Sequence, residues 1–225
     1  ADAGGRAEGP AGRRRVAVSA DRARDRFHYI TNGVNPEQFS MSAADNQAVE
    51  TLRKRHAGTT NIVFVGYLSE IKGIPELLGA MRRLRDLGES SIRLFLVGAN
   101  RLGSFVRDYL VSNRLEDLVI PIGPVLHDQV KRWMSFADIF ILPSHAENVP
   151  TVMFEALYLG VPSIVTDVGG ISQVVTNRRH CLVIEPQSEA AIVSVFMAIA
   201  IARYVYRDIT WADLYHIVAG AAPRI

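Results

Sequence analysis

Asn61-Ile-Val-Phe-Val-Gly66 is the stretch that decides the fold, a short and almost wholly apolar run that ends at a glycine. Such a run is typical of a strand that is buried on both faces of a parallel sheet. The segment Ile74 to Leu87 then repeats apolar side chains at helical spacing, and a second apolar run, Ile92 to Gly98, follows it. Strand, helix and strand in this order predict a β-α-β unit.

The same alternation continues along the chain. We expect further strands at 27–30, 118–123, 137–144, 162–166 and 181–186, and further helices at 105–115, 128–136, 151–159, 171–177, 188–202 and 211–218. Repeated alternation with short connections predicts the α/β class, with a Rossmann-like parallel sheet and helices on both faces. Such sheets bind ligands beyond the carboxyl ends of their strands, near the point where the strand order reverses.

Length and composition predict one folded domain. The chain has 225 residues, of which 48% are hydrophobic and 21% charged, which is too apolar for a disordered chain. Residues 1–24 are rich in Gly, Ala and Arg and are predicted to be a flexible tail, whereas residues 25–225 are predicted to form the domain. A formal net charge of +2 gives no argument for nucleic-acid binding. The arginines of the tail leave contact with a membrane surface open without indicating it.

The sequence also excludes several kinds of site. Cys181 is the only cysteine, so an internal disulfide and a Cys-based zinc site are excluded, and no motif indicates another metal. There is no Walker A sequence and no G-x-G-x-x-G, which speaks against P-loop enzymes and ordinary dinucleotide dehydrogenases. The longest uncharged apolar stretch, 190–202, is shorter than the roughly 20 residues of a spanning helix. Since the N-terminus lacks the apolar core of a signal peptide, we expect a cytoplasmic protein.

The loop from Gly66 to Gly73 has the features of an anion site. A glycine turn that opens a helix presents unpaired backbone N–H groups and the positive end of the helix dipole. Lys72 in this loop can pair with a phosphate, although an exposed loop lysine fits the sequence equally well. Gly98 and Gly123 end the next two strands, where they either turn the chain or let a flat base approach the backbone of Val125.

Two glutamates follow the strand expected at 137–144. Pro150 favours the first turn of the next helix, which places Glu147 in the preceding loop and Glu155 inside the helix. Glu155 is the only charged residue between Val149 and Thr166, so we expect it to be buried and to need hydrogen-bond donors. Sugar or ribose hydroxyls are suitable donors, and the alternative is a salt bridge to an arginine elsewhere in the chain.

Three further residues lie near these glutamates in the expected fold. Gly169 and Gly170 form another glycine turn before a helix, and we expect them to present N–H groups at the same edge of the sheet. His145 either joins the site or is ordinary polar surface. Two carboxylates also fit a glycosidase with one acid and one nucleophile or base, but a position of Glu155 on a buried helix speaks against that alternative.

Taken in order, these motifs resemble the C-terminal donor-binding domain of the family 4 (group 1) retaining glycosyltransferases, one half of the GT-B architecture. The resemblance covers about residues 27–218, and a match of six or more short pieces in order is specific. The pieces are 32–39 (NGVNPEQF), 64–73 (FVGYLSEIKG), 97–98 (VG), 122–123 (IG), 142–144 (LPS), Glu147 with 155–156 (EA), 160–164 (GVPSI) and 169–170 (GG).

The resemblance implies a domain that binds a sugar linked to UDP, GDP or ADP, without a metal or a cofactor. Lys72 would bind the diphosphate and stabilise it as it leaves, and Glu147 would bind hydroxyls of the donor sugar; these two are the implied catalytic residues. Glu155 would bind the ribose, and the backbone of Val125 would contact the base. The other implied donor-binding positions are Gly66, Tyr67, Asn148, Val149, Pro150, Thr151, Gly169 and Gly170.

The chain departs from the family pattern at three places. Tyr67 stands where the family commonly has an arginine, and tyrosine does not carry that charge. Gln173 replaces a common glutamate, and residues 177–181 replace a glycine-containing turn. The family's N-terminal acceptor domain has no counterpart in the sequence.

We therefore expect the donor-binding domain of a retaining glycosyltransferase, which transfers sugar to an acceptor held by another domain or subunit. Two alternatives stay open. A non-catalytic nucleotide-sugar-binding module is favoured by Tyr67. A sugar-nucleotide epimerase can share the architecture.

Overall fold

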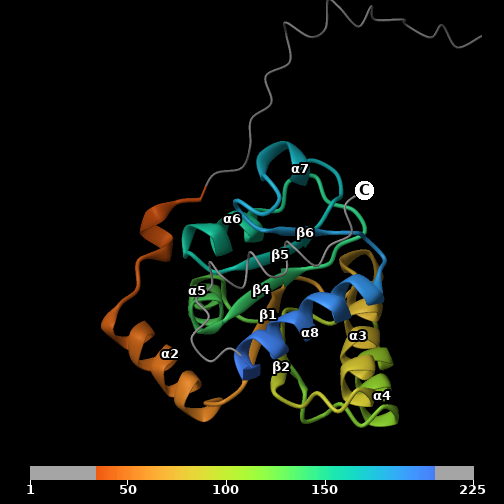
Figure 1. Cartoon of the computed structure of the whole chain (residues 1–225). Helices are drawn as coiled ribbons and strands as arrows, with labels where there is room; N and C mark the ends of the chain where they lie inside the picture. Colours follow the sequence, from red (N-terminus) through yellow and green to blue (C-terminus); the bar gives the residue numbers. More distant parts are fainter. Residues whose placement is uncertain (1–33, 206–225) are drawn as a thin grey trace, which may run out of the picture. The chain divides into compact units, whose positions relative to one another are not determined.

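Residues 34–205 are described by the structure, a computed structural model, with side chains to residue 202. The tail predicted at 1–24, the strand at 27–30 and the helix at 211–218 lie outside these residues. Within the described range a single sheet lies between helices on its two faces (Figure 1).

Six parallel strands form the sheet, in the order β3-β2-β1-β4-β5-β6. Each strand coincides with an apolar run in the sequence, and the Rossmann-like α/β prediction is confirmed. The order reverses between β1 and β4, so this pair marks the switch point. The strands are β1 (Thr60–Val65), β2 (Ile92–Val97), β3 (Val119–Gly123), β4 (Ile139–Leu142), β5 (Ser163–Thr166) and β6 (Leu182–Ile184).

A helix stands between each strand and the next along the chain, as parallel β-α-β units require. None of the helices within residues 34–205 combines the length and the apolar character needed to cross a membrane. The helical elements are η1 (Pro36–Phe39), α2 (Ala43–Arg55), η2 (Glu70–Lys72), α3 (Ile74–Asp86), α4 (Phe105–Ser112), α5 (His127–Phe136), α6 (Thr151–Tyr158), α7 (Ile171–Val174) and α8 (Glu189–Val205).

Strands β1 and β2 supply apolar side chains to both apolar clusters of the domain. Ile62 and Phe64 of β1 belong to the larger apolar cluster, whereas Val63 between them belongs to a second, smaller one. This alternation follows from the two-residue period of a strand. Helices α3 and α8 pack against each other over the larger cluster, and α2 packs on α5 beside the smaller one (Figure 1). Burial on both faces explains why the strands are continuous apolar runs.

Helix α2 was not predicted from the sequence. Apart from Asp45, its buried residue is Val49, so it lacks the apolar stripe by which an amphipathic helix is recognised. A capping box starts it instead: the Ser42 hydroxyl accepts from the Asp45 N–H, and the Asp45 carboxylate accepts from the Ser42 N–H. The S-x-x-D spacing of these two residues was the available signal.

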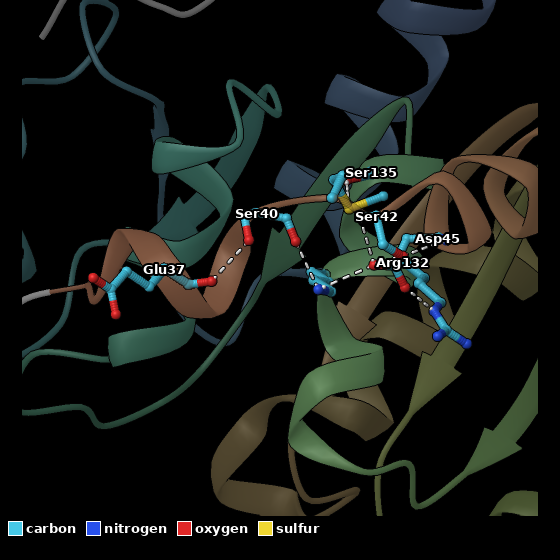
Figure 2. A network of polar contacts seen from close by, with 8 residues as sticks. Glu37, Ser40, Ser42, Asp45, Arg132 and Ser135 are labelled. Carbon is cyan, nitrogen blue, oxygen red and sulfur yellow. Dashed lines mark hydrogen bonds and ion pairs between the residues drawn. The ribbon is translucent and has the colours of Figure 1, made fainter.

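Asp45 also fixes α2 to α5 (Figure 2). Its buried carboxylate accepts a hydrogen bond from Nε of Arg132 and lies 3.1 Å from Nζ of Lys131. Lys131 in turn donates to the Ser40 carbonyl, 2.7 Å away. The hydrogen bonds from Ser42 and Arg132 hold the pKa of Asp45 well below its usual range.

Acid is expected to weaken the native protein partly through Asp45. A carboxylate whose pKa is lowered by folding stabilises the native state above its unfolded pKa, and this contribution is lost as the pH falls from about 4 through the lower native value. Asp45→Asn should be less stable at pH 7 and should lose less stability than the wild type between pH 5 and 3. Urea unfolding midpoints across that range measure both effects.

The matched control is Glu50→Gln on the same helix. Glu50 pairs with Lys54 at 3.7 Å, but both side chains are more than half exposed, and such pairs contribute little. The control should therefore follow the wild-type profile. If Asp45→Asn follows that profile too, Asp45 does not contribute to the acid response.

Candidate functional site

The predicted site residues lie in loops at the carboxyl edge of the sheet, around the switch point. The loop after β1 contains Lys72, the loop after β4 contains Glu147, and the turn after β5 contains Gly169. The His145 N–H donates to the Ile71 carbonyl at 2.8 Å, which ties the β4 loop to the β1 loop. Because β1 and β4 are neighbours in the sheet, residues about 75 positions apart in the chain meet here.

Lys72 and Glu147 form an ion pair, with Nζ 2.5 Å from Oε1. The same Oε1 accepts a hydrogen bond of 2.7 Å from the buried Ser144 hydroxyl. Only 23% of the Lys72 side chain and 9% of the Glu147 side chain are exposed, so Lys72 is not a freely exposed loop lysine. Ser144 was predicted as part of a strand and not as a site residue; its hydroxyl orients the carboxylate of Glu147.

Glu155 is buried inside α6, as the sequence predicts. Its nearest charged partner among the described residues is Nε2 of His127, 4.0 Å from Oε1, and no arginine pairs with it there. Burial raises the pKa of Glu155, and the nearby His127 opposes that shift. Among residues 34–202, whose side chains the structure describes, no protein group donates a hydrogen bond to this carboxylate.

The segment before α6 differs in detail from the prediction. Pro150 is the N-cap of α6 and not a residue of its first turn, and Thr151 is the first helical residue. Proline has no N–H, so Pro150 can contact a ligand only through its ring or carbonyl. The N–H groups that remain as candidates in this segment are those of Asn148 and Val149.

Gly169 and Gly170 hold the Glu147 loop in place. The Gly170 N–H donates to the Asn148 carbonyl at 2.8 Å, so this group faces the loop and not a ligand, contrary to the expectation from sequence. Gly169 has a φ of +58° and lies so close to the Glu147 carbonyl oxygen that no Cβ fits between them. Contact between two backbones at this point requires glycine.

Tyr67 lies at the end of β1, with half of its surface exposed. The guanidinium carbon of Arg101 lies 3.6 Å from the centre of its ring. Gly66 precedes it, and the Gly66 N–H continues the ladder to the Val97 carbonyl. Val125 follows β3 and packs with its side chain on both apolar clusters, which leaves its backbone as the part that can contact a base.

His145 is not ordinary polar surface. Its side chain is 18% exposed, and its Nε2 lies 3.0 Å from Oε2 of Glu76 in the first turn of α3. Within residues 34–205 no group of three or more His, Cys, Asp or Glu side chains is arranged to hold a metal ion.

Comparison with known proteins decides the family to which the chain belongs. Residues 59–200, more than half of the chain, match the family model of the group 1 glycosyl transferases. The chain belongs to this family. Lys72, Glu147 and Glu155 all lie within the matched range of the group 1 domain.

Relatives within the group 1 family are longer than this chain. TuaC of Bacillus subtilis, assigned as a teichuronic acid biosynthesis glycosyltransferase, is 35% identical over 191 residues, which cover 80% of this chain and 44% of TuaC. A D-inositol 3-phosphate glycosyltransferase of Pseudarthrobacter chlorophenolicus is 27% identical over 145 residues, covering 63% of this chain and 34% of that protein. The chain thus spans less than half the length of these relatives.

Solved structures match the same fold. HepE of Anabaena in complex with UDP has a TM-score of 0.68 at 20% identity, and the match covers 85% of this chain and 51% of HepE. The C-terminal domain of LpcC, a group 1 protein of Francisella tularensis, has a TM-score of 0.62 at 20% identity. The match covers 84% of this chain and 98% of the LpcC domain. The described fold is therefore that of the C-terminal half of a GT-B protein.

Proposed function

We propose that this chain is the donor-binding part of a retaining glycosyltransferase, which moves a sugar from a nucleotide-diphosphate sugar to an acceptor. The observation that carries the proposal is the pairing of Lys72 with Glu147, together with Glu155, a buried acid without a protein hydrogen-bond donor among the described side chains. Phosphate, sugar hydroxyls and ribose hydroxyls are the groups that such a set of side chains recognises.

Each side chain has a chemical task in this proposal. Lys72 binds the diphosphate and stabilises the charge that develops on it as the bond to the anomeric carbon breaks. Glu147 accepts hydrogen bonds from hydroxyls of the sugar, and Ser144 holds its carboxylate in position. Glu155 accepts from the ribose hydroxyls. The backbone of Val125 contacts the base, and N–H groups at Asn148 and Val149 complete the anion site.

Transfer needs an acceptor site, which we assign to another domain or subunit. The proposal agrees with the length of the relatives, of which this chain covers less than half. Separating the acceptor from the donor site removes the positioning that makes transfer fast. The chain alone should therefore bind a donor more readily than it transfers a sugar.

Titration calorimetry with UDP-glucose, GDP-mannose and ADP-glucose tests the proposal. We expect saturable binding of at least one of the three and weaker binding of the corresponding nucleoside. No binding of any of them contradicts the donor role.

Tyr67 favours a second candidate, a non-catalytic module that binds nucleotide sugars, because tyrosine brings no charge to the diphosphate. Product analysis of the bound donor separates the two functions. Slow hydrolysis of the sugar–phosphate bond, or transfer after addition of a partner that holds the acceptor, supports the enzyme. Binding without either reaction supports the module.

A further inference from the structure

Lys72, the cation of the proposed donor site, is already paired with a carboxylate. Glu147 neutralises Lys72 at 2.5 Å, and Glu155 adds a second carboxylate. A nucleotide-diphosphate sugar brings further negative charge on its two phosphates. Preorganised cations bind a diphosphate and stabilise it as it leaves, so a second cation besides Lys72 would strengthen the site.

Arg101 is fixed by its backbone beside the loop of Lys72. The Leu68 N–H donates to the Ala99 carbonyl, and the Arg101 N–H donates back to the Leu68 carbonyl, both at 2.9 Å. These bonds extend the pairing of β1 with β2 past the ends of the strands. Gly98 allows the backbones of the two segments after β1 and β2 to approach each other, since a Cβ at Gly98 would overlap the Gly66 carbonyl oxygen.

The Arg101 side chain is held by an aromatic ring and not by an acid. Its guanidinium carbon lies 3.6 Å from the ring centre of Tyr67, a geometry in which the ring face attracts the cation. No carboxylate of the described residues lies within ion-pair distance of it. Because stacking uses the face of the guanidinium, its N–H groups remain free to donate in the plane.

We propose that Arg101, stacked on Tyr67, is the second cation that binds the diphosphate of the donor. This inference rests on the proposed function and deepens it. Tyr67 then acts as a positioning residue: it brings no charge itself but orients a guanidinium whose planar donors match two phosphate oxygens. The charge that Tyr67 lacks in its own side chain is supplied from the end of the neighbouring strand.

Binding of nucleoside diphosphates and monophosphates by the full chain tests the inference. Of UDP, GDP and ADP, the one that the wild type binds most tightly is compared with its monophosphate. Arg101→Met should lower the affinity for the diphosphate about tenfold, which is the loss expected for a charge-assisted contact. Its affinity for the monophosphate should fall about twofold or less. Tyr67→Leu should also lower the affinity for the diphosphate. The double variant should lose less binding free energy than the sum of the losses in the two single variants.

Arg107→Met is the matched control. Arg107 is an exposed arginine of α4 that pairs with its neighbour Asp108, and its replacement should leave both affinities unchanged. Unfolding midpoints of the ligand-free variants should equal that of the wild type, because Arg101 is exposed. Equal losses for diphosphate and monophosphate, or no loss in Arg101→Met, overturn the inference and leave the proposed function standing. Absence of binding to the wild type overturns the proposed function itself.

Discussion

Gly169→Ala is expected to destabilise the protein and to abolish donor binding. The residue has a φ of +58°, which costs a non-glycine residue about 1–2 kcal/mol. Its added methyl group would also overlap the carbonyl oxygen of Glu147, which is backbone and cannot rotate away. Either the β5 turn or the Glu147 loop must move. Movement of the loop separates Glu147 from Lys72 and Ser144, so the damage reaches the site directly.

Gly103→Ala is the control that separates the cost of the positive φ from the cost of steric overlap with a neighbouring backbone. Gly103 has nearly the same φ, +59°, but a Cβ there meets no atom within 4 Å. We expect Gly169→Ala to lose at least about 2 kcal/mol more stability than this control in urea unfolding. Binding of the tightest nucleotide sugar should survive in Gly103→Ala and disappear in Gly169→Ala.

Cys181 provides an independent measure of folding in these variants. The thiol is buried, and burial raises its pKa to about 11. It should therefore react slowly with Ellman's reagent at pH 8 in every folded variant and quickly in urea. A Gly169→Ala variant that stays folded by this measure and binds donor as the wild type does would contradict the role of Gly169 as a support of the site.

The sheet could be predicted from the sequence because its strands are buried on both faces. Runs such as Ile62 to Val65 have no polar residue, and the intervening helices repeat apolar residues at helical spacing. Helix α2 escaped prediction because its place in the fold depends on the polar network of Asp45 with Arg132 and Lys131 and not on an apolar stripe. A pattern of apolar residues cannot reveal an element that polar contacts hold.

The site could be predicted as a set of residues but not as a set of contacts. Gly66, Lys72 and Glu147 follow strand ends, and Glu155 is the only charged residue of an apolar helix, and that much is local sequence. The pairing of Lys72 with Glu147 depends on β1 and β4 being neighbours, which the order of segments along the chain does not specify. The stacking of Arg101 on Tyr67 likewise depends on β1 lying beside β2. The hydrogen bond from the Gly170 N–H to the Asn148 carbonyl depends on the geometry of two loops, which the sequence does not reveal.

Glu155→Gln is expected to raise stability and to weaken donor binding. Burial raises the pKa of Glu155, so its charge destabilises the native state once the pH exceeds that raised value. The sign follows from linkage: a raised carboxyl pKa contributes stability below the unfolded value, and that stability is lost as the pH rises through the native value. Glutamine keeps the volume and removes the charge. The variant should therefore be more stable than the wild type at pH 8, and the difference should shrink towards pH 4.

Binding should change in the opposite direction. Hydrogen bonds from ribose hydroxyls to a carboxylate contribute about 1.5–3 kcal/mol, so their weakening should raise the Kd of the tightest nucleotide sugar by roughly 10- to 100-fold. Glu116→Gln is the control, because Glu116 is exposed before β3 at the amino edge of the sheet, and neither quantity should change there. Urea midpoints and calorimetry on the same preparations measure both. A more stable Glu155→Gln with unchanged affinity would leave the buried charge without a task in donor binding, whereas a joint loss of stability and affinity would assign Glu155 to the packing of α6.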